Sequence, residues 1–140
     1  MRFLHSIVRV KNLESSLHFY CELLGLREVR RMEHEGGRFT LVFLAAPDDG
    51  EGFLELTYNW DSEEDYGNAR NFGHLAYEVD NIYEFCARLQ AAGVTINRPP
   101  RDGRMAFVQS PDHISIEFLQ RGEPLPVAEP WVSMANVGTW

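Results

Sequence analysis

Two histidines and two glutamates hold equivalent places in the two halves of this 140-residue sequence. His5 and His74 stand near the start of each half, and Glu55 and Glu117 stand near its end, each within a run typical of a strand. One histidine on a strand is more often a core or edge residue than a metal ligand. One glutamate in an apolar strand usually lies at an edge or beside an arginine. The repetition of both residue types is what favours a common function.

Taken together, these four side chains have the chemistry of a metal site. Burying two carboxylates close together costs free energy or raises their pKa values, and a divalent cation removes that cost. Two neutral imidazoles and two carboxylates would balance the charge of such a cation. Mixed imidazole and carboxylate donors suit first-row transition metals and do not suit Ca²⁺. If both halves fold alike and face one hollow, the sequence predicts a site for such a metal.

The elements that would position these residues repeat in the same order, βαβββ, in each half. Asn12 and Asn81 are candidate helix caps, apolar residues follow each at helical spacing, and Gly25 and Gly93 are candidate helix ends. The predicted strands of the first half are residues 3–10, 26–35, 39–46 and 53–59. The predicted strands of the second half are residues 72–79, 94–98, 105–109 and 114–120.

This repetition predicts an α+β fold in which two βαβββ modules form a curved mixed sheet. The modules cover about residues 1–60 and 70–120, and together they would form a single domain of residues 1–120. Few identities relate the two halves, so the shared order of elements, caps and stops is the stronger sign of an internal duplication. A Pro-rich tail follows at residues 121–140 and shows no repeated helix or strand pattern.

Composition excludes several classes of protein. The formal net charge of −8 argues against nucleic acid and anionic membrane surfaces as partners. No apolar run approaches the ~18 residues that a membrane-spanning helix needs, and the first residues lack the layout of a signal peptide. Cys21 and Cys86 are far apart in helix-like segments and are typical of thiols in a reducing compartment. A cytoplasmic protein is therefore expected.

Four stretches resemble the glyoxalase I (lactoylglutathione lyase) family of the vicinal oxygen chelate superfamily: FLHSIVRV, FLELTYNW, NFGHLAYEVDNIYE and AFVQSPDHISIEF. The resemblance runs from about residue 1 to residue 120. It implies the paired βαβββ fold of that family. It also implies an enzyme of methylglyoxal detoxification, which isomerises the hemithioacetal of methylglyoxal and glutathione to S-D-lactoylglutathione through an enediolate.

The resemblance further implies that the metal ligands are His5, Glu55, His74 and Glu117. The protein would be a homodimer with its sites at the subunit interface, where one chain supplies His5 and Glu55 and the other supplies His74 and Glu117. Family members with histidine at the first ligand position and no long inserted loops resemble the nickel- or cobalt-activated class. Four side chains and two waters make an octahedron, which suits Ni²⁺ or Co²⁺, whereas Zn²⁺ prefers fewer ligands.

Roles in proton transfer also follow from the resemblance. Glu117 is implied as the base that removes a proton from one carbon and returns it to the next, and Glu55 would serve the other substrate enantiomer. The alternative is that both carboxylates are simple ligands.

Glutathione carries two carboxylates, so its site needs cationic or hydrogen-bonding groups. Arg9 and Asn59 each follow a predicted ligand by four residues on the same strand face, and Arg70 precedes one by four. All three match the family's glutathione contacts. Arg104 and Met105 fall where the family places a loop over the substrate. The alternative for the arginines is that they are solvated surface charges.

Other functions are compatible with the same fold. An Fe(II) extradiol dioxygenase of the superfamily would use two histidines and one carboxylate and leave other positions open. Here Glu55 fills a fourth position, which disfavours that interpretation. A metal-free resistance protein that binds a drug would need aromatic walls and none of the four ligands.

Overall fold

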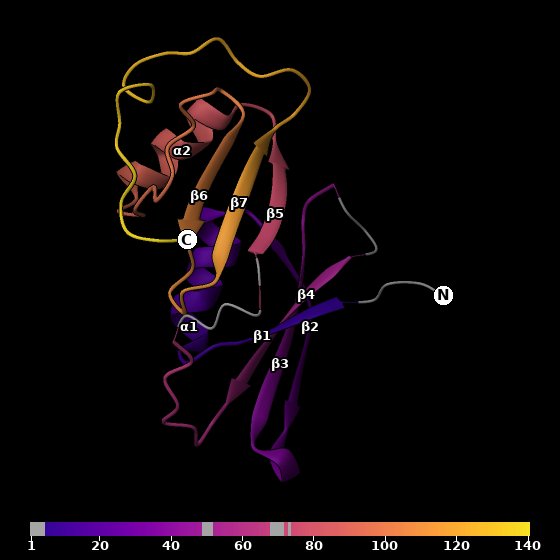
Figure 1. Cartoon of the computed structure of the whole chain (residues 1–140). Helices are drawn as coiled ribbons and strands as arrows, with labels where there is room; N and C mark the ends of the chain where they lie inside the picture. Colours follow the sequence, from indigo (N-terminus) through magenta and orange to yellow (C-terminus); the bar gives the residue numbers. More distant parts are fainter. Residues whose placement is uncertain (1–4, 49–51, 68–71, 73) are drawn as a thin grey trace. The chain divides into compact units, whose positions relative to one another are not determined.

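The computed structural model describes residues 5–48, 52–67, 72 and 74–140. The chain forms two compact units, Met1–Gly67 and Asn68–Trp140, and each unit has its own sheet and its own helical segment (Figure 1). In both units a first strand is followed by a helical segment and then by further strands. The predicted α+β class with two similar modules is confirmed.

The first unit contains a four-stranded mixed sheet with the strand order β1-β4-β3-β2. Its strands are β1 (His5–Arg9), β2 (Arg27–His34), β3 (Phe39–Ala45) and β4 (Phe53–Asn59). The first strand runs parallel to the last, and the other neighbouring strands are antiparallel. The chain therefore crosses to the far edge after β1 and returns through β2 and β3, until β4 completes the sheet beside β1.

The helical segment of the first unit begins at Asn12, whose side chain accepts a hydrogen bond from the Ser15 N–H at 2.8 Å. This cap is the one that the sequence predicts. The α-helix α1 spans only Leu13–Leu17, and the chain continues as a π-helical turn over His18–Leu23. Gly25 follows with a φ of 89°, a conformation that favours glycine. The predicted helix is therefore confirmed in extent, but its hydrogen bonding changes midway.

The second unit contains a three-stranded sheet with the strand order β5-β7-β6. Its elements are β5 (His74–Val79), α2 (Ile82–Ala91), β6 (Met105–Gln109) and β7 (Ser115–Gln120). The first strand again runs parallel to the last, and β6 pairs antiparallel with β7. Asn81 caps α2 by accepting hydrogen bonds from the N–H groups of Tyr83 and Glu84. The second unit thus repeats the plan of the first with one strand fewer.

The missing strand is the one predicted over residues 94–98. That segment makes a single isolated bridge, between Arg98 and Phe107, and no regular strand. Pro99 and Pro100 follow it directly, and both are fully buried. Proline cannot donate a backbone hydrogen bond, so the two prolines prevent the pairing from continuing beyond Arg98. The prediction of a strand at residues 94–98 was wrong, because the residues before Arg98 form no ladder with β6.

The two faces of each sheet differ in character. In β7, the buried side chains of Ile116 and Phe118 alternate with Glu117, and the Phe118 ring packs on Phe85 of α2 with centroids 4.7 Å apart. The apolar face therefore lies against the helix. Glu117 lies on the opposite face, because successive side chains of a strand point to opposite sides. Glu55 of β4 alternates in the same way with buried leucines.

The tail, residues 121–140, packs on the second unit. Trp131 is only 4% exposed, and its ring stacks on Tyr83 of α2 with an interplanar angle of 7°. The Leu125 N–H donates to the carbonyl of Gly103 at 3.0 Å. A Cβ at Gly103, whose φ is 67°, would lie 2.0 Å from the carbonyl oxygen of Leu125. The close approach of the tail therefore requires glycine at this position.

Both cysteines are free thiols. Cys86 is buried in α2, and burial raises the pKa of its thiol to about 12, so it stays protonated and unreactive. Within the described ranges, no helix is long and apolar enough to cross a membrane.

Because Trp131 fills a closed position between the tail and α2, we expect Trp131→Ala to lower the free energy of unfolding by about 3 kcal/mol. Urea denaturation followed by circular dichroism measures this loss. Val127→Ala is the matched control, since Val127 lies in the same tail but is exposed. Equal stabilities of the two variants would show that the tail does not hold its place through Trp131.

Candidate metal centre

In the second unit, His74 and Glu117 form a close pair. β5 and β7 are parallel, and His74 is opposite Ser115, which places Glu117 one step further along the same face. The Nε2 atom of His74 lies 3.0 Å from Oε2 of Glu117. The imidazole is 44% exposed, whereas the carboxylate is 13% exposed. In this pair the carboxylate is therefore largely buried, whereas the imidazole is partly exposed to solvent.

The first unit contains the same pair in the same register. His5 of β1 is opposite Phe53 of β4, so Glu55 is again the next residue on that face. Its Oε2 atom lies 3.2 Å from Nε2 of His5, with exposures of 6% for the glutamate and 40% for the histidine. The second carboxylate oxygen, Oε1, accepts a hydrogen bond from the hydroxyl of Thr57 at 3.3 Å. The two units therefore share the register and the spacing of this pair as well as the order of their elements.

Each pair is accompanied by a phenylalanine that the sequence analysis did not single out. Phe43 of β3 is opposite Glu55, and Phe107 of β6 is opposite Glu117. Each ring meets the neighbouring imidazole edge to face, with centroids 5.8 Å apart at His5 and 5.5 Å apart at His74. These contacts fix the histidine rings beside their glutamates. The sequence could have indicated both residues, since each half has a phenylalanine in the strand that precedes the strand of its glutamate.

The spacing within each pair suits two ligands of one cation. Metal–nitrogen and metal–oxygen bonds of about 2.1 Å at right angles place the two donor atoms about 3.0 Å apart. The observed distances of 3.0 and 3.2 Å agree with this value. Among the described residues, no group of three or more histidine, cysteine, aspartate or glutamate side chains is arranged to hold a metal ion. Each unit therefore offers one imidazole and one carboxylate, which is half of the predicted ligand set.

Two of the predicted glutathione contacts continue the same strands. Arg9 is opposite Thr57, so Asn59 is the next residue on that face of β4. Glu55 has the same position relative to His5. The carbonyl oxygen of the Asn59 side chain is buried and accepts no hydrogen bond from any residue that the structure describes. A buried acceptor of this kind favours a donor from a ligand. Arg70, the third predicted contact, lies outside the described residues.

Arg104 and Met105 lie at the start of β6, after a short loop. Asp102 accepts hydrogen bonds from the backbone N–H groups of both residues and pairs with Arg98 at 2.8 Å. Burial alone would raise the pKa of Asp102, but the hydrogen bonds from Arg98 and the two N–H groups outweigh it and lower the pKa to about 2. The Arg104 guanidinium donates to the carbonyl of Gly122 in the tail. Asp102 thus organises the junction between this loop and β6, where both predicted contacts lie.

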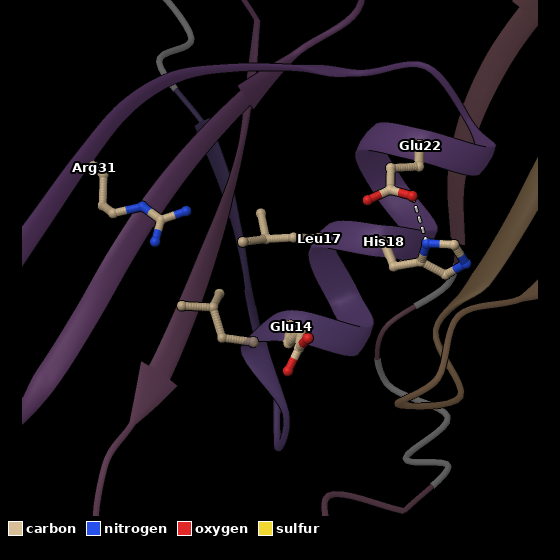
Figure 2. A pocket seen from close by; sticks show the side chains of 6 residues that line it. Glu14, Leu17, His18, Glu22 and Arg31 are labelled. Atoms are coloured by element: carbon tan, nitrogen blue, oxygen red, sulfur yellow. Dashed lines mark hydrogen bonds and ion pairs between the residues drawn. The ribbon is translucent and has the colours of Figure 1, made fainter.

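A separate pocket of about 550 Å³ lies between the helical segment and β2 of the first unit (Figure 2). Its lining consists of Leu13, Glu14, Leu17, His18, Glu22 and Arg31. None of the predicted site residues belongs to it. His18 and Glu22 form an imidazole–carboxylate pair at 2.8 Å, but both side chains are largely exposed. This pair supplies a control for the two pairs whose glutamates are largely buried.

Comparisons with known proteins identify the family of this chain. A family model of the Glyoxalase/Bleomycin resistance protein/Dioxygenase superfamily matches residues 2–118, and the chain belongs to this superfamily. The chain is 46% identical over 128 residues to the lactoylglutathione lyase of Neisseria meningitidis serogroup A, which covers 86% of this chain and 91% of that protein.

Solved structures of glyoxalase I share the fold. The trypanothione-dependent glyoxalase I of Leishmania major is 36% identical with a TM-score of 0.79, and 86% of each chain is covered. Glyoxalase I from Zea mays is 30% identical with a TM-score of 0.74, over 87% of this chain and 45% of that one. The predicted family and fold are therefore confirmed.

If both pairs hold one metal, His5→Ala and His74→Ala should each weaken Co²⁺ binding by more than about tenfold, because each removes an imidazole donor. Isothermal titration calorimetry on metal-stripped protein measures the affinity. His18→Ala, which breaks an exposed pair of the same kind, should leave the affinity unchanged. Unchanged binding in His74→Ala would exclude that histidine as a ligand.

Proposed function

We propose that this protein is a lactoylglutathione lyase, a metal-dependent enzyme that isomerises the hemithioacetal of methylglyoxal and glutathione to S-D-lactoylglutathione. The observation that carries this proposal is the pair of histidine and glutamate repeated in the same register in both units. The 46% identity to a lactoylglutathione lyase supports it. A dioxygenase or a metal-free drug-binding protein would not need both carboxylates.

The proposed metal site combines the two pairs, with His5 and Glu55 from one chain and His74 and Glu117 from its partner in a homodimer. Two neutral imidazoles and two carboxylates would balance the charge of a divalent cation, and such donors suit Ni²⁺ or Co²⁺. When bound, the cation would stabilise the negative charge that develops on the two oxygens of the substrate. Among the described residues, no three potential donors gather at one place, and this supports a site to which two chains contribute.

Glu117 is the proposed base. It takes the proton from the carbon that carries sulfur and returns it to the neighbouring carbon by way of an enediolate. The hydroxyl proton of the first carbon passes to the oxygen of the second, so that a thioester and a secondary alcohol result. The contacts of the two glutamates differ in a way that favours this role. Thr57 donates to the second oxygen of Glu55, whereas no described residue donates to the second oxygen of Glu117. The equivalent of Thr57 beside Glu117 is Leu119, which has no donor. Glu117 therefore has an oxygen available for the proton, and Glu55 would serve the other enantiomer.

The glutathione part of the substrate is assigned to Arg9, Asn59 and Arg70. Arg9 supplies a positive charge for a carboxylate, and the buried carbonyl oxygen of Asn59 can accept an N–H from the tripeptide. Arg70 keeps this assignment from the sequence alone. Arg104 and Met105 would lie beside the bound substrate, at the junction of loop and strand that Asp102 organises. A cytoplasmic location belongs to the same proposal, since free cysteines and glutathione both suit a reducing compartment.

Metal-stripped protein should not convert methylglyoxal and glutathione, and Ni²⁺ or Co²⁺ should restore turnover better than Zn²⁺. The reason is that four side chains leave two open positions only in six-fold coordination, which Zn²⁺ favours less. The assay follows S-lactoylglutathione by absorbance, together with elemental analysis of the purified protein. Full activity after chelation would refute the proposed enzyme, and best activity with Zn²⁺ would refute the metal class.

Glu117→Gln should lower kcat by about 100-fold or more, because the amide cannot accept the proton. The rate is compared at full metal occupancy, measured by elemental analysis, and the dimer is followed by light scattering. Glu22→Gln is the matched control, since Glu22 pairs with an exposed histidine outside the site. A near-normal rate in the metal-loaded Glu117→Gln dimer would exclude Glu117 as the base.

A further inference from the structure

The tail continues beyond Trp131 and reaches the other side of the second unit. The N–H of Val137 donates to the carbonyl of Asn97 at 2.9 Å, and the Asn97 side chain donates back to the carbonyl of Val137 at 2.9 Å. The Arg101 guanidinium donates a single hydrogen bond to the carbonyl of Met134 at 2.9 Å. Figure 1 shows the yellow tail passing α2 and ending beside β6. The tail residues Met134 and Val137 lie beyond residue 118, where the match to the superfamily ends.

The last anchored side chain of the tail is Trp140. Its ring lies over Phe107 with centroids 6.0 Å apart and an interplanar angle of 32°. Phe107 is opposite Glu117 in the sheet, and its ring also meets His74 edge to face. Phe107 therefore stands on the face of the sheet that carries the proposed ligands. Trp140, in contact with Phe107, lies on that face as well.

The two tryptophans of the tail differ in exposure. Trp131, on the helix side, is 4% exposed and serves packing. Trp140 is 40% exposed, although its ring is held against Phe107. An indole that is fixed on one side and open on the other can offer an apolar surface to a ligand. The indole and phenyl rings carry no charge, so their surface suits an apolar group better than the carboxylates of glutathione.

We propose that Trp140 determines the specificity of the site for the aldehyde part of the substrate, by forming with Phe107 an aromatic wall beside His74. This inference rests on the proposed function. The wall contacts the group that the 2-oxoaldehyde brings to the hemithioacetal. A methyl group gains little from an aromatic surface, whereas an aryl group gains stacked or edge-to-face contacts. The enzyme therefore prefers aryl-substituted 2-oxoaldehydes to methylglyoxal, and Trp140 is the residue that creates the preference.

The experiment compares kcat/KM for the glutathione hemithioacetals of phenylglyoxal and methylglyoxal. In Trp140→Ala the ratio of the two values falls about fivefold, because the aryl contact is lost while the metal ligands remain. Trp140→Phe keeps most of the ratio. Val132→Ala, an exposed apolar residue elsewhere in the tail, leaves the ratio unchanged. Melting temperatures verify that each variant is folded, and Trp140→Leu gives the same comparison if the alanine variant is not.

A binding measurement separates this inference from the proposed function. Metal-loaded protein is titrated with S-benzylglutathione and S-methylglutathione, and Trp140→Ala weakens only the benzyl conjugate. An unchanged ratio of kcat/KM, or an equal loss for both aldehydes, would overturn the role of Trp140, since a residue that only positions His74 affects both substrates alike. Absence of turnover in the wild-type protein with either aldehyde would overturn the proposed function instead. The affinities for the two glutathione conjugates would then still show whether Trp140 contacts an aryl group.

Discussion

The parallel pairing of the first and last strand in each unit is the constraint on which the site depends. In both units the histidine is opposite a residue two positions before the glutamate, and this register places Nε2 within 3.2 Å of Oε2. A slip by one residue would turn the glutamate to the helix side and bury an unpaired carboxylate in the core. The helical segment and the intervening antiparallel strands are therefore needed to bring two distant strands together in one register.

The duplicated pair has diverged around its glutamates while its register is maintained. A phenylalanine lies opposite the glutamate and beside the histidine in both units, so the orientation of each imidazole is fixed in the same way. The difference is two residues beyond the glutamate, where Thr57 donates to Glu55 and Leu119 cannot donate to Glu117. One carboxylate is held at both oxygens by described residues, and the other is held at one. In the proposed mechanism, this difference separates Glu55 as a fixed ligand from Glu117 as the carboxylate that accepts a proton.

Much of this arrangement could be predicted from the sequence, because short-range patterns determine it. Alternation placed His5, Glu55, His74 and Glu117 on strands, and the caps at Asn12 and Asn81 were correctly predicted. The register that pairs each histidine with its glutamate is a long-range property, and no local pattern encodes it. Phe43 and Phe107 are absent from the predicted site because a phenylalanine in a strand is typical of a core. The path of the tail depends on contacts with Tyr83 and Gly103. No periodicity in the sequence predicts these contacts.

The proposed function requires the two pairs to act together, and this requirement couples metal binding to assembly. The His18–Glu22 pair also places an imidazole 2.8 Å from a carboxylate, on the exposed side of a helical segment, so the closeness of these two groups alone does not distinguish the proposed ligand pairs. Two donors from one unit leave most coordination positions to water, whereas four donors displace water from four positions and bind far more tightly. A cation that binds only the joined modules must also stabilise their association by the same free energy. In the proposed dimer the metal is therefore part of the subunit interface as well as of the catalytic site.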